Sequence, residues 1–110
     1  MVPGSVSRTI TLPNNTTPVT LYSQLIKSTG LSQLGPNCNR LVIRGDDSLG
    51  SGIVYEGDVT VSSSNYGIAL SAGDSRTWPA ESQLNNISLI DKWLVGSTGG
   101  LKVNVELYVA

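Results

Sequence analysis

The sequence predicts an all-β domain, an antiparallel β-sandwich of jelly-roll or immunoglobulin-like type with about seven or eight short strands. The clearest evidence is residues 101–109, where apolar and polar side chains alternate without a fault, as in a strand with one buried face. Further strand-like segments recur at spacings of about 8–12 residues and are separated by turn-forming residues. The single helical pattern, near residues 21–28, is too short to change the class.

Strands are expected where branched aliphatic or aromatic residues lie between turn signals. Their expected ranges are 8–12, 19–22, 40–44, 53–62 with a bulge or kink at Gly57, 66–70, 75–78, 87–95 and 101–109. Val59 and Val61 share one parity and are expected to point inward. Residues 87–95 are apolar at both parities, which indicates a central strand covered on both faces, with Trp93 in the core.

The short helix is predicted from apolar residues four positions apart. Leu21 and Leu25 form one such pair, Tyr22 and Ile26 form another, and Gly30 is well placed to end the helix. Because two turns are not stable in isolation, the helix is expected to exist only by docking on the sheet.

A chain of 110 residues without a linker or an internal repeat fits a single β-domain over residues 1–110. Residues 1–7 precede the first expected strand and are interpreted as an N-terminal arm that contacts neighbouring molecules. The first five residues contain no apolar region of the kind found in signal peptides, and no apolar run approaches the roughly 20 residues that span a membrane.

The charge balance argues against two classes of partner. Charged residues make up 14% of the chain and the net charge is −1, whereas nucleic acids and anionic membranes attract concentrated lysine and arginine. We therefore expect no nucleic-acid or membrane partner. A neutral surface rich in serine, threonine and asparagine is instead suited to partial coverage by another protein.

The chain contains no histidine, which excludes Ser-His-Asp and Cys-His catalytic sites and histidine-ligated zinc. Gly73-Asp74-Ser75 is therefore interpreted as a turn. Glu81, near Trp78, is the only acid in an aromatic setting that could suit a glycosidase. Cys38 is the only cysteine, so it forms no intrachain disulfide and is expected to be a buried apolar residue rather than a reactive thiol. We expect no enzyme activity and no cofactor.

One glycine-rich loop, residues 45–52, offers oxygen ligands. Asp46, Asp47 and Ser48, with Asp58, could suit calcium, but their spacing matches no known calcium loop. We expect a solvated turn and no metal. Arg44-Gly45-Asp46 spells the integrin-binding tripeptide and is likewise interpreted as turn chemistry.

The aromatic residues are the candidates for a contact surface. Phenylalanine is absent, so two tryptophans and four tyrosines carry all the aromatic area. The candidate interface residues are Trp78, Tyr55, Tyr66 and Tyr108. Trp78, beside Pro79 at a strand end, could equally be a core residue, and a carbohydrate platform is an alternative use of these rings.

A family resemblance covers roughly residues 40–110. The residues that carry it are Tyr66-Gly67-Ile68-Ala69-Leu70, Ala72-Gly73-Asp74-Ser75, Leu89 to Leu94, Val95-Gly96-Ser97-Thr98-Gly99-Gly100 and Val103-Asn104-Val105, with Leu41-Val42-Ile43 and Tyr55-Glu56-Gly57 upstream. This pattern of turn and core residues resembles the small β-domains of tailed-bacteriophage virion proteins. It contains no functional residues that could be carried over.

The resemblance implies a structural component of a virion assembled in the host cytoplasm, such as a capsid decoration or cement protein or another head-associated protein. The implied partners are the major capsid protein or other virion proteins, with the chain itself in several copies as a homo-oligomer. Two alternatives remain open: a tail or fibre component, and a β-module that binds carbohydrate or a host surface.

Overall fold

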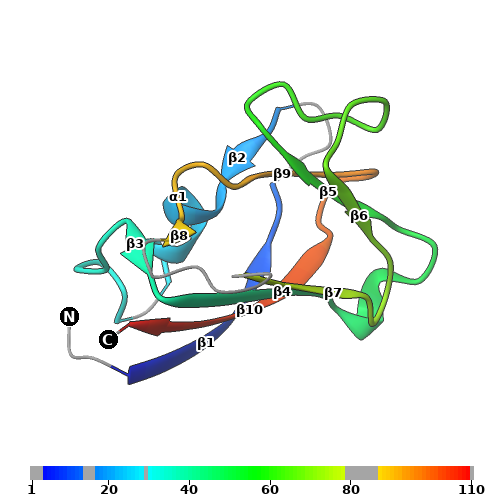
Figure 1. The fold of residues 1–110 in the computed structure, drawn as a ribbon. Coiled ribbons are helices and arrows are strands. Elements are labelled where there is room, and N and C mark those ends of the chain that lie inside the picture. Colours follow the sequence, from blue (N-terminus) through cyan, green and yellow to red (C-terminus); the bar gives the residue numbers. More distant parts are fainter. Residues whose placement is uncertain (1–3, 14–16, 29, 79–86, 110) are drawn as a thin grey trace.

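The computed structural model describes residues 4–13, 17–28, 30–78 and 87–109. Its strands are β1 (Gly4–Thr11), β2 (Val19–Thr20), β3 (Asn37–Cys38), β4 (Arg40–Gly45), β5 (Val54–Gly57), β6 (Ile68–Leu70), β7 (Ser75–Trp78), β8 (Ile87–Ser88), β9 (Trp93–Gly96) and β10 (Lys102–Val109). The helical elements are α1 (Leu21–Leu25) and a 3-10 turn, η1 (Asp47–Leu49). The predicted all-β class with one short helix is therefore confirmed (Figure 1).

The strands form two four-stranded antiparallel sheets, in the orders β1-β10-β4-β7 and β2-β9-β5-β6, and a small pair, β3-β8. Figure 1 shows the two larger sheets as separate layers, with α1, β3 and β8 grouped at one end. The apolar faces of the sheets bury a common core. The most deeply buried side chains are Leu12, Leu21, Leu25, Leu31, Leu41, Ile43, Val54, Leu89, Leu94, Val103 and Leu107.

The final strand, β10, lies inside its sheet between β1 and β4. Its alternation is confirmed, because Val103, Val105 and Leu107 are buried whereas Lys102 and Glu106 are exposed. The register is continuous along β1, from Gly4 opposite Val109 to Thr11 opposite Lys102. Residues 4–7, expected to belong to an N-terminal arm, are thus the first half of β1. Residues 1–3 lie outside the described residues.

The helix α1 begins where the sequence indicates. Thr20 is its N-cap, and the hydroxyl of Thr20 accepts a hydrogen bond from the backbone N–H of Ser23 at 3.1 Å. Leu21 and Leu25 are fully buried, as their four-residue spacing predicts. The tyrosine between them in the sequence, Tyr22, donates from its hydroxyl to the carbonyl of Leu34 at 2.7 Å. Docking on the core therefore stabilises this five-residue helix.

Two expected strands, 53–62 and 87–95, are only partly correct. Residues 87–95 do not form one central strand, because a turn separates β8 from β9. That turn buries Leu89 and exposes 48% of Ile90, which explains apolar residues at both parities without a two-sided strand. Residues 58–62 form a turn rather than a strand, since the carboxylate of Asp58 accepts a hydrogen bond from the N–H of Thr60 at 2.8 Å. Val61 is buried there, but Val59 is 57% exposed and does not point inward.

The loop after β4 contributes to the core. Asp46 caps η1, and Leu49 at the end of η1 is buried against the main cluster. Gly45 lies between this turn and the turn at residues 71–74. Its N–H donates to the carbonyl of Asp74 at 2.8 Å, and its own carbonyl accepts from the N–H of Gly73 at 2.9 Å. The backbone of Gly45 is thereby held against a neighbouring turn.

We predict that Gly45→Ala destabilises the protein by about 1–3 kcal/mol, because overpacking at a fixed backbone position carries a cost of this size. The added methyl group would overlap the carbonyl oxygen of Ser71 and lie 3.0 Å from Cδ1 of Leu49. Gly35→Ala is the matched control, since a methyl group there meets no atom within 4 Å. Urea denaturation checks the prediction, and equal unfolding free energies for the two variants would contradict it.

Candidate interaction surfaces

The outer face of the β1-β10-β4-β7 sheet is mostly polar, and we call it the β10 face. Its residues alternate with the buried ones along each strand. They are Ser5, Ser7, Thr9 and Thr11 of β1; Lys102, Asn104, Glu106 and Tyr108 of β10; Arg40, Val42 and Arg44 of β4; and Ser75 and Thr77 of β7. Seven of these thirteen residues carry a hydroxyl group, and four, Lys102, Glu106, Arg40 and Arg44, are charged.

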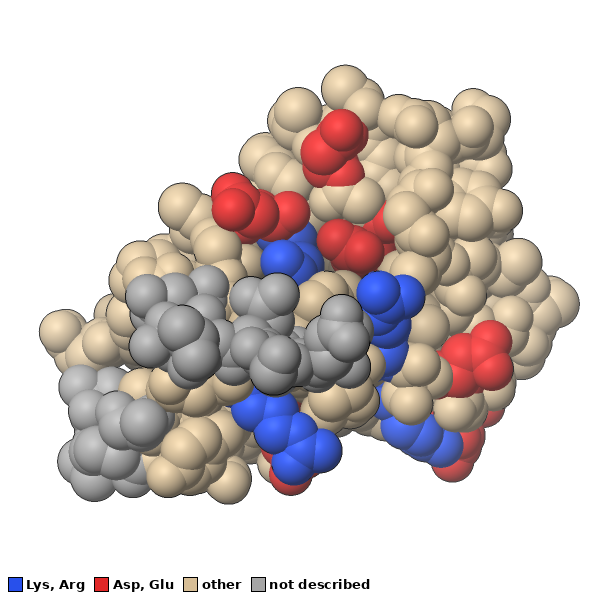
Figure 2. Space-filling view, in the orientation of Figure 1, with Lys and Arg blue, Asp and Glu red and all other residues tan. Residues whose placement is uncertain are grey.

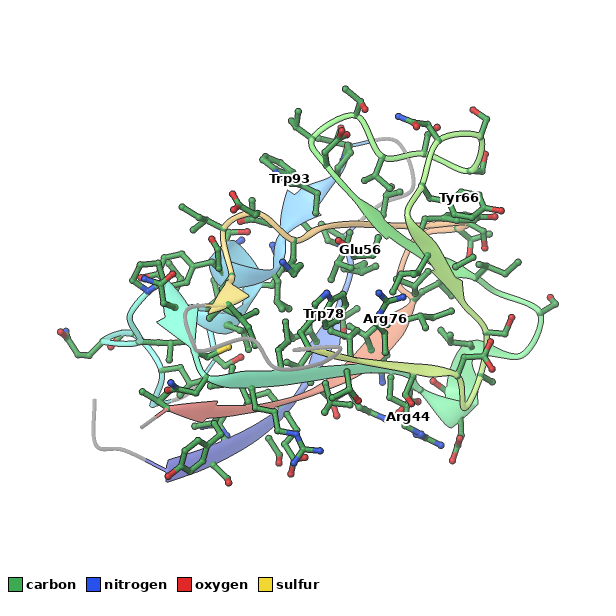
Figure 3. All side chains as sticks on the ribbon, in the orientation of Figure 1. Arg44, Glu56, Tyr66, Arg76, Trp78 and Trp93 are labelled. Atoms are coloured by element: carbon green, nitrogen blue, oxygen red, sulfur yellow. The ribbon has the colours of Figure 1, made fainter. Side chains whose placement is uncertain are left out.

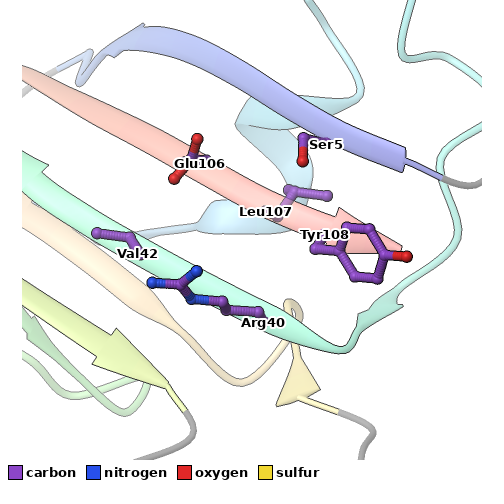
Figure 4. Close-up of a pocket in the computed structure, with 6 residues that line it drawn as sticks. All are labelled: Ser5, Arg40, Val42, Glu106, Leu107 and Tyr108. Atoms are coloured by element: carbon purple, nitrogen blue, oxygen red, sulfur yellow. The ribbon is translucent and has the colours of Figure 1, made fainter. Parts of the chain in front are cut away.

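A shallow pocket of about 300 Å³ lies on the β10 face (Figure 4). The strand register places Tyr108 between Ser5 of β1 and Arg40 of β4, and Figure 4 shows the Tyr108 ring beside Arg40 at one end. Tyr108 is 45% exposed. Glu106 lines the same pocket, and neither Arg40 nor Glu106 forms an ion pair with another described residue. The pocket therefore offers a cation, a carboxylate and an aromatic ring to a partner.

The outer face of the β2-β9-β5-β6 sheet is more apolar, and we call it the tyrosine face. Tyr55 of β5 lies opposite Val95 of β9 in the register. The ring of Tyr66 lies against that of Tyr55, with ring centroids 4.9 Å apart and planes inclined by 39°. Tyr66, labelled in Figure 3, lies on the β6 side of the molecule. Its side chain is 49% exposed. Two of the three tyrosines predicted as interface residues, Tyr55 and Tyr66, thus form one pair.

The expected core position of Trp93 is wrong. Leu94 points into the core, so its neighbours Trp93 and Val95 point to the opposite, tyrosine face. Trp93 lies opposite Gly57 in the register, and Val61 packs over Gly57, with Cγ2 3.2 Å from where a β-carbon would be. Val61 and Val95 are buried but lie outside the main cluster. A second, smaller apolar cluster therefore covers part of this face.

A hollow of about 240 Å³ adjoins Tyr66 and is lined also by Gly57, Asp58, Asn65 and Gly67. Its polar groups are fixed by a short network. The side-chain amide of Asn65 donates to the hydroxyl of Thr60 at 2.7 Å, and that hydroxyl donates to the carboxylate of Asp58. The hydrogen bonds from Thr60 lower the pKa of Asp58, so its carboxylate stays ionised.

The third group of residues around an aromatic side chain lies between the two sheets, at Trp78. Its ring is half-buried and packs against the core, which makes it partly a core residue. Two cations flank it: Cζ of Arg76 lies 5.6 Å from the ring centroid and Nζ of Lys92 lies 5.5 Å from it. Figure 3 shows Trp78, Arg76 and Glu56 together in the space between the sheets. Burial raises the pKa of Glu56, although Lys92 and Arg76 act to lower it.

The four predicted interface residues therefore do not form one site. Tyr108 lies on the β10 face, Tyr55 and Tyr66 lie on the tyrosine face, and Trp78 lies between the sheets. Three residues around Trp78, namely Arg76, Lys92 and Glu56, were not predicted from the sequence. Alternation along β7 places Arg76 on the same side as Trp78 and could have indicated the first of these contacts.

The candidate metal and thiol groups have structural partners. Asp46 accepts hydrogen bonds from Ser48, and Asp47 pairs with Arg44 at 2.7 Å. Among the described residues, no three acidic or cysteine side chains gather closely enough to hold a metal ion. The expected burial of Cys38 is confirmed, and burial raises its pKa to about 11. Glu81 lies outside the described residues.

The integrin-type tripeptide is not displayed on a loop. Arg44 and Gly45 are the last two residues of β4, and Gly45 is buried.

The charged residues are dispersed. Figure 2 shows basic and acidic side chains scattered over a mostly uncharged surface on one side of the molecule. Within the described residues, no helix has the length and apolar character required to cross a membrane.

We predict that Glu56→Gln raises the urea midpoint at pH 7. A carboxyl group with a raised pKa in the folded state favours folding while it is protonated. This stabilisation is complete below pH 4.5, the ordinary pKa of the carboxyl group. It is lost as the pH rises through the raised pKa of Glu56 in the folded protein. Glutamine cannot ionise, so the gain at pH 7 should disappear below pH 4.5. Glu106→Gln, at an exposed carboxylate, is the control, and a gain independent of pH would refute the prediction.

Comparisons of the chain with protein-family models, with curated proteins and with solved structures gave no match. The surfaces described above, together with the resemblance of residues 40–110, are therefore the grounds for a functional proposal.

Proposed function

We propose that this chain is a structural component of a tailed-bacteriophage virion. In this proposal it is a capsid decoration or cement protein, or another head-associated protein. It acts through protein–protein contacts with the major capsid protein or other virion proteins, in several copies and without catalysis. It joins the particle during assembly in the host cytoplasm.

The observation that carries the proposal is the β10 face. This face presents one exposed tyrosine beside an arginine, two residue types that are enriched in protein contact surfaces. Tyrosine and arginine are enriched among residues that dominate binding energy. The strands beneath this face are packed on the core, so the face is rigid and little ordering is needed on binding.

The low charge of the chain also supports this role. A net charge of −1 gives little electrostatic repulsion between copies at high local density. The confirmed all-β fold agrees with the fold that the resemblance implies.

We predict that Tyr108→Ser weakens binding to emptied heads of the phage that encodes the chain, by about 2 kcal/mol or roughly 30-fold in Kd. The measurement is co-sedimentation of the purified chain with the heads over a concentration series. Tyr66→Ser is the matched control, because Tyr66 is 49% exposed and Tyr108 is 45% exposed, but they lie on opposite sheets. Absence of head binding by the unmodified chain would refute a head role, and binding to tails instead would favour the tail or fibre alternative.

A second candidate function, binding of carbohydrate or a host surface, is favoured by the hollow beside Tyr66. Protein sites for neutral sugars combine an aromatic face with fixed hydrogen-bonding side chains. Tyr66 supplies the ring, while Asp58 and Asn65 supply a carboxylate and an amide held in place through Thr60. Trp78 is less suited to this task, because its ring is flanked by Arg76 and Lys92 and packs on the core.

If the hollow binds sugar, a glycan array should give signals that Asp58→Asn and Tyr66→Ala both reduce by tenfold or more, because each variant removes one recognition element. Tyr108→Ala, on the β10 face, should leave those signals unchanged. An array without signal, or equal losses for Tyr66→Ala and Tyr108→Ala, would reject the hollow as the carbohydrate site.

A further inference from the structure

Strand β1 is an edge of its sheet with half of its backbone groups directed outward. The N–H of Leu12, just after β1, donates to the carbonyl of Leu101 at 2.8 Å. Because the antiparallel register continues without interruption to Gly4, even-numbered residues pair with β10. The backbone N–H and C=O groups of Ser5, Ser7, Thr9 and Thr11 therefore point to the free edge. No described backbone group pairs with them.

The other sheet edges are short. The second edge of this sheet, β7, has four residues and is followed in the sequence by Pro79. The edges of the other sheet, β2 and β6, have two and three residues. β1 has eight residues, with neither proline nor lysine. Proteins that prevent pairing at an edge shorten it, or place proline, lysine or an inward-pointing charged residue there. Of these features, β1 has only the charged residue, Arg8.

Arg8 is the one charged residue of β1. It lies on the inner side of the strand, in the row of Val6 and Ile10, and its Nη1 donates to the carbonyl of Ser7 at 2.8 Å. A carbonyl oxygen has two lone pairs, so this contact leaves one available. It also leaves the outward N–H groups untouched.

We propose that the free edge of β1 is a self-association site, at which β1 of a second copy of this chain pairs antiparallel about a two-fold axis. The β1-β10-β4-β7 sheet of one copy and the same sheet of the second copy then become one continuous sheet. A second copy fits this edge because an isologous pair uses the outward groups of both strands at once. The net charge of −1 opposes the approach of two copies only weakly.

The register of this pair is restricted by Arg8. An axis through Arg8 would place the two guanidinium groups in directly opposed positions, which is destabilising. An axis at Ser7 places Arg8 opposite Val6 of the second copy, and an axis at Thr9 places it opposite Ile10 of the second copy. In both registers the outward backbone groups of Ser7 and Thr9 form hydrogen bonds with β1 of the second copy. Hydroxyl side chains of the two copies then lie next to one another on the β10 face.

This inference deepens the proposed structural role and rests on it for the expectation of several copies. Its test nevertheless measures self-association of the purified chain. A monomeric chain that binds heads would overturn the edge pairing alone. A dimeric chain that does not bind heads would overturn only the head role.

The first experiment compares Ser7→Pro with Ser7→Ala by light scattering over a dilution series. Proline removes the outward N–H of residue 7, which both registers use, and edge strands tolerate proline at such positions. The expected result is a dimer for the unmodified chain and for Ser7→Ala, and a monomer for Ser7→Pro. Thermal unfolding checks that Ser7→Pro is folded. A monomeric unmodified chain, or a dimeric folded Ser7→Pro, would overturn the proposal.

The second experiment uses disulfide trapping of Ser7→Cys and Thr9→Cys and does not need a proline. Residues that face each other across the axis have Cα atoms about 5.5 Å apart, within disulfide range. One of the two variants should therefore cross-link under mild oxidation, and which one does so identifies the axis. Cys38 is buried and has a pKa of about 11, so we expect that it does not cross-link under the same conditions. If neither variant cross-links, the pairing is wrong.

Discussion

The central constraint on this structure is the pairing of β10 with β1 on one side and β4 on the other. The alternating side chains of β10 place three buried residues, Val103, Val105 and Leu107, in the middle of the core. The same alternation places Tyr108 and Glu106 on the opposite face, beside Arg40. One strand therefore determines both the centre of the core and the geometry of the proposed contact face.

The two outer faces of the sandwich differ in chemistry. The β10 face is polar and open, whereas the tyrosine face carries a second apolar cluster under the turn that follows β5. The two proposed functions therefore involve different faces, although the aromatic residues of both faces were predicted as one set of interface residues. A variant at Tyr108 can be compared with one at Tyr66 because each leaves the other surface intact.

Much of the fold could be predicted from the sequence. Residues 101–109 have a strong period of two, residues 40–44 are rich in branched aliphatic side chains, and residues 75–78 end at Pro79. The errors occurred where apolar residues have tertiary roles outside strands. Val61 packs on Gly57 from a turn, and Leu89 enters the core from another. The cluster around Trp78 could not be found in advance, because Glu56 and Lys92 reach it from strands and turns distant in the sequence. Such convergence depends on the strand order, which local patterns do not encode.

The position of β10 has a consequence for how the chain folds. β10 is the last strand in chain order, yet it is an interior strand of its sheet, and Gly4 of β1 pairs with Val109. On a ribosome, β1 has no partner strand, and β4 has only β7, until β10 has emerged. Contacts of such long sequence separation slow folding and leave strand edges open to other chains. The rate of folding, and the chance of misassembly during it, should therefore depend on how soon β10 docks between its neighbours.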